Sequence, residues 1–196
     1  MFNYMLSTCE ERLNQELIKA YHYRLKAGVF EDIANGYPIG EYKNRRNMVS
    51  DITTSSPENV AEDMELLLES YHEKEPHDLE DLAEFHAKFE KIHPFQDGNG
   101  RTGRLLLNAQ LESFKFAPVA IKASHALEYK GSLERWQADG DDAPFVHLLL
   151  ACETEELEKR LEFLAQFPED AKSRAPLDER VLELLHANPT LSAREL

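Results

Sequence analysis

The chain has 196 residues, of which 42% are hydrophobic, enough to bury the core of one domain with a short appendage. Its formal net charge of -15 argues against a general nucleic-acid-binding surface, because such surfaces neutralise phosphates with clustered lysine and arginine. Cys9 and Cys152 lie far apart and outside any metal-ligand spacing, which predicts a reducing compartment and no disulfide.

The N-terminal residues carry no sign of a targeting segment. Residues 1–6 lack the basic start and apolar run of a signal peptide, and no stretch approaches the length that spans a bilayer. We expect a cytoplasmic protein that does not enter a membrane.

A first helix is predicted after Leu13 and Asn14, which resemble a hydrophobic staple and an N-cap with Ile18 as the staple partner. Gly28 marks its end. The expected buried stripe consists of Leu17, Tyr21 and Leu25.

Residues 31–54 show no helical period and are interrupted by Gly36, Pro38 and Gly40, so we expect a loop with a short hairpin around residues 47–54. Ser56 and Pro57 then open a second helix. Its expected inner face consists of Val60, Met64, Leu67, Leu68 and Tyr71.

The remaining elements are also predicted to be helical. One helix precedes residue 93 and another covers residues 101–114; a turn follows at residues 116–121, and further helices span about 124–137 and 144–167. The apolar face of the helix before residue 93 consists of Leu79, Leu82, Phe85, Phe89 and Ile92. The predicted fold class is all-α, with a short β-hairpin and a C-terminal helical tail.

The composition changes after Phe167. We expect a main domain over residues 1–167, a polar linker with two prolines over 168–179, and over 180–196 the start of a winged-helix or helix-turn-helix segment that is cut short. A helical tail that packs on the main domain remains an equal alternative.

The stretch HPFQDGNGRTGR, residues 93–104, contains the glycine spacing of a dinucleotide-binding loop in Gly98, Gly100 and Gly103. That loop requires a buried strand before the glycines, and here a helix precedes them. NAD binding is therefore disfavoured. Glycine amides followed by a helix N-terminus still predict a bound phosphate.

Four side chains in this stretch suggest chemistry, and each has a simpler alternative. His93 is a candidate general base or merely a helix C-cap, and Asp97 is a candidate Mg²⁺ ligand or merely a turn residue. Arg101 and Arg104 are spaced to reach a polyphosphate from one helix face, or are solvated surface residues. Phe95 is expected to be core. Their concentration within twelve residues favours the functional interpretation.

The same twelve residues resemble the full signature of the Fic domain family, H-P-F-x-[DE]-G-N-G-R-x-x-R, without a substitution. Residues 40–43, GEYK, are similar to the family's G-E-Y-R. The helical order over residues 13–167 is also similar, whereas the tail is outside the resemblance.

The resemblance implies a nucleotidyltransferase that moves AMP from ATP to a Ser, Thr or Tyr hydroxyl of a target protein. His93 would be the catalytic base, and Asp97 would hold Mg²⁺. The phosphate-binding residues would be Gly98, Asn99, Gly100, Arg101 and Arg104, with Arg104 on the γ-phosphate.

Further roles are implied around this centre. Asn108 and Tyr129 would line the adenine pocket, although Tyr129 also fits a plain core position. The flap that clamps the target segment by strand pairing would consist of Asn47, Met48, Val49, Ser50, Asp51, Ile52, Thr53 and Thr54.

Two other functions remain open. Relatives that transfer a different phosphate group carry Lys where this chain has Gly100, which argues against that chemistry here. The Fic part could also be the sensor of a DNA-binding regulator, although nucleic acid is not expected to bind this acidic chain.

Restraint of the enzyme is not visible in the sequence. The family's inhibitory pattern [ST]-x-x-x-E-[GN] matches only residues 54–59, where Pro57 excludes an internal helical position and Glu58 fits a first helical turn. We expect either an inhibitory helix upstream of this chain or a separate antitoxin-like inhibitor. A homo-oligomer is compatible with the sequence.

Overall fold

The structure is a computed structural model that describes residues 1–49 and 52–166. Ser50 and Asp51 of the predicted flap lie outside the described residues. So do the domain end expected at residue 167, the linker 168–179 and the segment 180–196.

The described residues are mostly helical, and the predicted all-α class is confirmed. Two very short strands, β1 and β2, pair antiparallel with Met48 opposite Thr53 and Val49 opposite Ile52. In chain order the elements are α1 (Phe2–Thr8), α2 (Gln15–Lys26), α3 (Phe30–Ala34), β1 (Met48–Val49), β2 (Ile52–Thr53), α4 (Val60–His72), α5 (Leu79–Ile92), α6 (Asn99–Ser113), the 3-10 turn η1 (Ala123–His125), α7 (Ala126–Asp139) and α8 (Ala143–Ala165).

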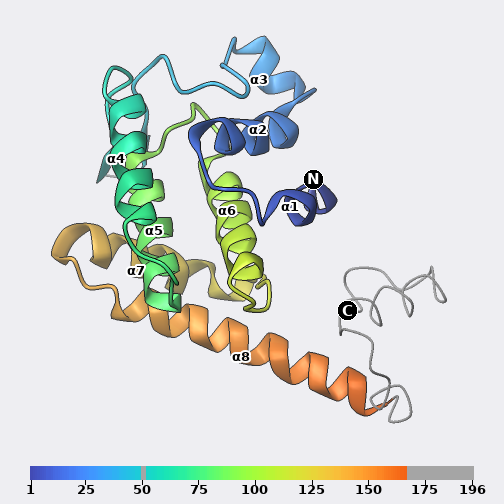
Figure 1. Ribbon diagram of the computed structural model, residues 1–196. Coiled ribbons are helices and arrows are strands. Elements are labelled where there is room, and N and C mark those ends of the chain that lie inside the picture. The colour runs from blue at the N-terminus through green and yellow to red at the C-terminus, as the bar shows by residue number, and fades with distance from the viewer. Residues whose placement is uncertain (50–51, 167–196) are drawn as a thin grey trace.

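Helices α5 and α6 form the centre of the bundle and pack against each other (Figure 1). Helix α4 packs on α5, α2 crosses the end of the bundle where α6 begins, and α8 crosses the opposite end. Two apolar clusters fill the interior, and both draw residues from α5 and α6. The loop between these two central helices is therefore held between elements that contribute to both apolar clusters.

The apolar periodicity of α5 explains this central position. Every residue of the predicted face of α5, from Leu79 to Ile92, is buried. A capping box closes the start of the helix, with Asp78 and Asp81 each accepting the other's backbone N–H. The predicted N-cap of α2 is also confirmed, because Asn14 Oδ1 accepts the Leu17 N–H at 2.9 Å.

Three details of the prediction were wrong. Residues 31–34 are not loop but part of α3, a five-residue helix that tertiary contacts of Asp32 stabilise. Leu25 is only partly buried, whereas His22 and Lys26 on the same helix are buried. Helix α4 begins at Val60 rather than at Pro57, because residues 57–59 form a turn.

Within the part of the chain that the structure describes, no helix combines the length and apolar character needed to cross a membrane.

Candidate active site

His93 closes helix α5 at the entrance of the motif loop. It is the C-cap residue, and its backbone N–H donates to the Phe89 carbonyl at 3.0 Å. Its backbone is left-handed, with φ 53° and ψ 60°, which is uncommon for a residue other than glycine. The C-cap interpretation is thus right for the backbone of His93, and it leaves the side chain available for chemistry.

The imidazole of His93 is held as a neutral ring with a definite tautomer. Its Nδ1 lies 3.3 Å from the Glu90 carbonyl oxygen, and because a carbonyl only accepts, Nδ1 carries the hydrogen. Burial lowers the pKa of His93 to about 4, and the charge of Lys43 acts in the same direction. At pH 7 the Nε2 atom therefore keeps a lone pair that can accept a proton.

Asn99 fixes the shape of the loop that follows. Its Oδ1 accepts the Phe95 N–H at 2.7 Å, and its Nδ2 donates to the Phe95 carbonyl at 2.7 Å. The residue is buried, so the side chain of Asn99 binds the loop internally. The phosphate role expected of Asn99 would fall to its backbone amide.

The start of α6 presents free backbone amides. Its first intrahelical bond runs from the Thr102 N–H to the Gly98 carbonyl, which leaves the amides of Asn99, Gly100 and Arg101 without an intrahelical acceptor. Gly98 precedes the helix with φ +84°, where an L side chain would be strained. This geometry suits an anion at the N-terminus of α6.

Asp97 lies in the loop immediately before these amides, and its side chain is 50% exposed. Its carboxylate contacts Lys26 Nζ and lies 3.2 Å from Arg101 Nη2. Burial alone would raise the pKa of Asp97, but the contacts with Lys26, the Gly98 amide and Arg101 outweigh burial and hold the pKa below its usual range. An ionised, accessible carboxylate is the kind of oxygen donor that Mg²⁺ prefers.

Lys26 is a buried cation that sequence reasoning missed. Its side chain is 3% exposed, and Nζ lies 2.6 Å from Oδ2 of Asp32, which is itself buried. Burial favours the neutral amine, but the two carboxylates outweigh it and raise the pKa of Lys26, so the ammonium stays charged. Lys26 thus joins α2, α3 and the motif loop at Asp97.

His22 supports the same loop from α2. Its ring stacks on Phe95 with centroids 3.8 Å apart, and its Nε2 donates to the Asp97 carbonyl at 3.0 Å. Nδ1 accepts the Gly40 N–H at 2.9 Å. Phe95 is fully buried, as predicted, and His22 couples it to the residues of the GEYK segment.

The two motif arginines differ in their exposure and in their side-chain contacts. Arg101 is exposed and pairs with Asp97, whereas Arg104 is partly buried with its guanidinium 5.8 Å from the ring centroid of Tyr129. Among the described residues, no carboxylate forms an ion pair with Arg104. The alternative of a solvated surface residue fits the exposed Arg101 better than the partly buried Arg104.

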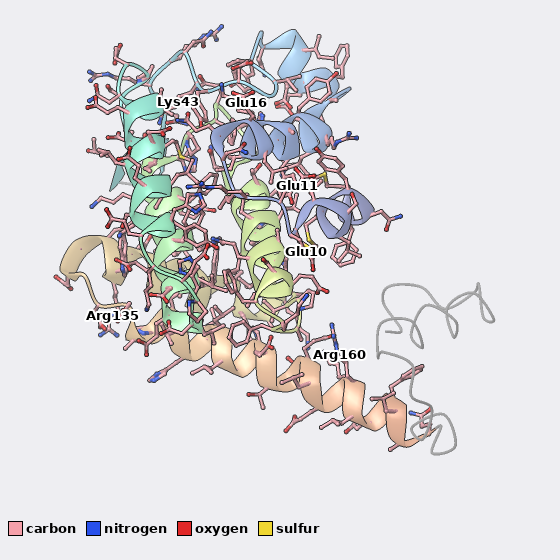
Figure 2. All side chains as sticks on the ribbon, viewed as in Figure 1. Glu10, Glu11, Glu16, Lys43, Arg135 and Arg160 are labelled. Carbon is pink, nitrogen blue, oxygen red and sulfur yellow. The ribbon has the colours of Figure 1, made fainter. Side chains whose placement is uncertain are left out.

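Lys43 holds the two ends of the predicted flap. Its buried Nζ donates to Asn47 Oδ1 at 2.7 Å and to Thr54 Oγ1 at 3.0 Å. Asn47 Nδ2 in turn donates to the Phe95 carbonyl at 2.9 Å. Burial lowers the pKa of Lys43 to about 8. Figure 2 places Lys43 at the end of the bundle where α2 lies, so β1 and β2 are anchored beside the motif loop.

Asn108 and Tyr129 have structural contacts of their own. The Asn108 amide donates to the Val119 carbonyl and accepts the Val119 N–H, at 3.1 and 2.7 Å. The Tyr129 hydroxyl lies 2.8 Å from His86 Nε2, and the residue packs in the apolar cluster. Their place in an adenine pocket stays a prediction.

Lys26 and His22 carried a signal that the sequence analysis did not use. His22 and Lys26 follow the buried Ile18 at intervals of four, so two polar residues extend an apolar stripe. Polar residues on a buried face indicate paired charges or a functional site.

Sequence comparison relates this chain to one protein family and to a named relative. The Fic/DOC family sequence model matches residues 12–111. The protein adenylyltransferase Fic of Nematostella vectensis is 36% identical over 126 residues, which cover 61% of this chain and 29% of that protein. The chain therefore spans less than a third of the length of this relative.

Solved structures show the same fold. A Fic domain containing signaling protein from Bacteroides thetaiotaomicron superposes with a TM-score of 0.71 at 24% identity, covering 81% of this chain and 67% of the other. Fic-1 (residues 134–508) from C. elegans gives a TM-score of 0.68 at 24% identity, covering 84% and 50%. With the family match extending over more than half of its residues, this chain belongs to the Fic/DOC family.

Proposed function

We propose that this chain is a protein adenylyltransferase, which moves AMP from ATP to a Ser, Thr or Tyr hydroxyl of a target protein. The observation that carries the proposal is the neutral His93 at the end of α5, whose Nε2 has no hydrogen-bond partner among the described residues and which precedes the N-cap of α6, Gly98, by five residues. The name of the Nematostella relative supports the same reaction.

The proton transfer follows from the tautomer of His93. Nε2 accepts the proton of the target hydroxyl, whose oxygen attacks the α-phosphorus of ATP. The bond between the α-phosphorus and the bridging oxygen breaks, and pyrophosphate leaves. Because Nδ1–H stays on the Glu90 carbonyl, the ring keeps its orientation while it gains the proton.

Positive charge and amides at the start of α6 would stabilise the phosphates. Backbone N–H groups at Asn99 and Gly100, which follow Gly98, offer an anion site, and Arg104 would neutralise the γ-phosphate. Arg101 would have to leave Asp97 to reach a phosphate. Asn108 on α6 and Tyr129 on α7 would line the pocket for the adenine ring of ATP.

Asp97 would hold Mg²⁺, because it is the ionised and accessible carboxylate of the motif loop. The ion supplies charge neutralisation on the phosphates when it is bound. Lys26 already neutralises this carboxylate, so binding of the ion competes with the ammonium group.

The target segment would pair with the flap of residues 47–54, which Lys43 anchors beside the motif loop. Such strand addition selects an extended segment through its backbone. The identity of the target then depends on side chains on either side of the hydroxyl.

Restraint would come from outside the described residues. Glu58, the glutamate of the sequence match to the inhibitory pattern, is exposed in the turn before α4, where it is hydrogen-bonded to Ser56. We therefore propose that an antitoxin-like partner or an upstream helix supplies the acidic group for Arg104. We place the enzyme and such an inhibitor in the cytoplasm as part of this proposal.

The experiment that tests this function is intact-mass analysis after incubation with Mg-ATP. We expect an AMP-sized addition on the chain itself or on an added target protein, and none with the His93→Asn variant. No addition by the wild-type chain to any protein, together with a salt-sensitive complex on duplex DNA, would instead favour the sensor of a DNA-binding regulator.

A further inference from the structure

Glu90 is a buried carboxyl group at the floor of the site. It lies on the last turn of α5, three residues before His93, and its side chain is 10% exposed. Its Oε1 is fully shielded from solvent and has no hydrogen-bond partner among the described residues. Burying a carboxyl group without a hydrogen-bond partner costs folding free energy. The burial of Glu90 therefore suggests that the residue has a function.

Four ionisable or charged groups surround this carboxyl. Oε2 lies 3.9 Å from His93 Nδ1, and Oε1 lies 4.0 Å from His86 Nε2. Arg104 on α6 and Tyr129 on α7 are near enough for their charges to interact with that of Glu90.

Of the two neighbouring imidazoles, only His93 has a free position. The Nδ1 of His86 donates to the Gly103 carbonyl at 3.2 Å, and its Nε2 accepts the Tyr129 hydroxyl at 2.8 Å. His86 is therefore satisfied as a neutral ring, and burial lowers its pKa to about 4. His93 alone can gain a proton on Nε2 while Nδ1 faces the carboxyl.

The backbone of α6 leaves room for Glu90. A Cβ atom added at Gly103 would collide with Glu90 Oε1. The absence of a side chain at Gly103 thus admits the carboxyl between α5 and α6.

We propose that Glu90 is a positioning residue for His93: its backbone carbonyl holds Nδ1–H, and the charge of its carboxylate, 3.9 Å from Nδ1, stabilises the imidazolium formed when Nε2 takes the target's proton. The proton moves from the hydroxyl to Nε2, Nδ1 keeps its own hydrogen, and the Nε2 proton passes to water after pyrophosphate has left. This role rests on the adenylyltransferase function proposed above.

The electrostatics agree with this geometry. Burial raises the pKa of Glu90 to about 7, against the opposing charge of Arg104. Below about pH 7 Glu90 carries a proton of its own and is neutral, and above about pH 7 its carboxylate charge faces the imidazole. Transfer should therefore increase as the pH passes upward through about 7.

The first test follows the His93 ring by NMR during a pH titration without nucleotide, in the wild type and in Glu90→Gln. We expect the ring signals of His93 to shift around pH 7 in the wild type, as Glu90 ionises, and to lose that shift in the variant. An equal shift in both proteins, or none in the wild type, would overturn the proposal. This readout does not depend on catalysis.

The second test measures AMP transfer against pH. Glu90→Gln should lower kcat about ten-fold or more with little change in the KM for ATP, and should remove the rise near pH 7. Glu84→Gln, on an exposed position of the same helix where Glu84 pairs with Lys88, is the matched control and should behave as wild type. An unaltered pH profile in Glu90→Gln would contradict the role. Absence of transfer by the wild type would reject the adenylyltransferase function and leave the NMR result to decide on Glu90.

Discussion

The ammonium group of Lys26 and the carboxylate of Asp97 form an ion pair that joins the last turn of α2 to the loop before α6. The pair extends to Asp32, so a buried cation lies between two carboxylates, one buried and one half exposed. The contact with Lys26 helps to hold the pKa of Asp97 below its usual range. The same contact holds Asp97, the candidate metal ligand, against the end of α2.

Lys26→Met should destabilise the fold by about 3 kcal/mol, because it leaves Asp32 buried without its cation. Urea unfolding measures this difference. Lys130→Met, which removes an exposed pair with Glu134, is the control and should cost less than about 1 kcal/mol. Recovery of part of the loss in Lys26→Met/Asp32→Asn would identify the unpaired carboxylate as the cause, and equal effects of the two single lysine variants would contradict the account.

His93→Asn should abolish transfer and leave the fold intact. Asparagine tolerates the left-handed backbone that His93 adopts, but it cannot accept the proton, so kcat should fall about a hundred-fold or more. Binding of Mg-ATP, measured by calorimetry, should stay close to wild type. Retained turnover would remove His93 from its role as base.

Asp97→Asn should weaken nucleotide binding only when Mg²⁺ is present. The amide keeps the size of the side chain and loses the charge that attracts the ion, so we expect an affinity loss of about ten-fold or more with Mg²⁺ and little change with EDTA. Calorimetric titrations under both conditions make the comparison. Equal losses in the two would mean that Asp97 supports the loop rather than the metal.

Much of this arrangement could be predicted from the sequence, for a physical reason. The apolar period of α5 and the cap of α2 depend on local pattern, which the sequence states directly. The HPFQDGNGRTGR motif also keeps its chemistry within twelve residues, so its loop and helix start needed no distant contacts to be recognised.

Other parts depend on contacts between distant residues. Helix α3 is too short to form alone and is held through the contact of Asp32 with Lys26, which no local pattern announces. Glu90 and Lys43 look like ordinary surface charges in the sequence and acquire their environment only from packing. The side-chain contacts of Arg101 with Asp97 and of Arg104 with Tyr129 likewise cannot be read from the spacing of the two arginines.

Glu90→Gln should stabilise the protein at high pH even though it lowers activity. The pKa of Glu90 is about 7 in the fold, above its ordinary value of 4.5, so the wild type loses stability as the pH rises between these values, and the variant does not. The unfolding free energy of the variant relative to wild type should increase by roughly 2 kcal/mol or more from pH 4.5 to pH 8. A constant difference across this range would show that Glu90 is not a strained, buried acid.

The central claim is that this chain transfers AMP with His93 as the base and the α6 amides as the phosphate site. It is tested most directly by asking which phosphate of ATP reaches the protein. The chain is incubated with Mg²⁺ and ATP labelled with ³²P at either the α- or the γ-phosphate, with a target protein and with His93→Asn in parallel. The account predicts label on protein from α-labelled ATP alone, and none with the variant. Label on protein from γ-labelled ATP would contradict it. A target protein that gains mass but carries label from neither form of ATP would contradict it as well.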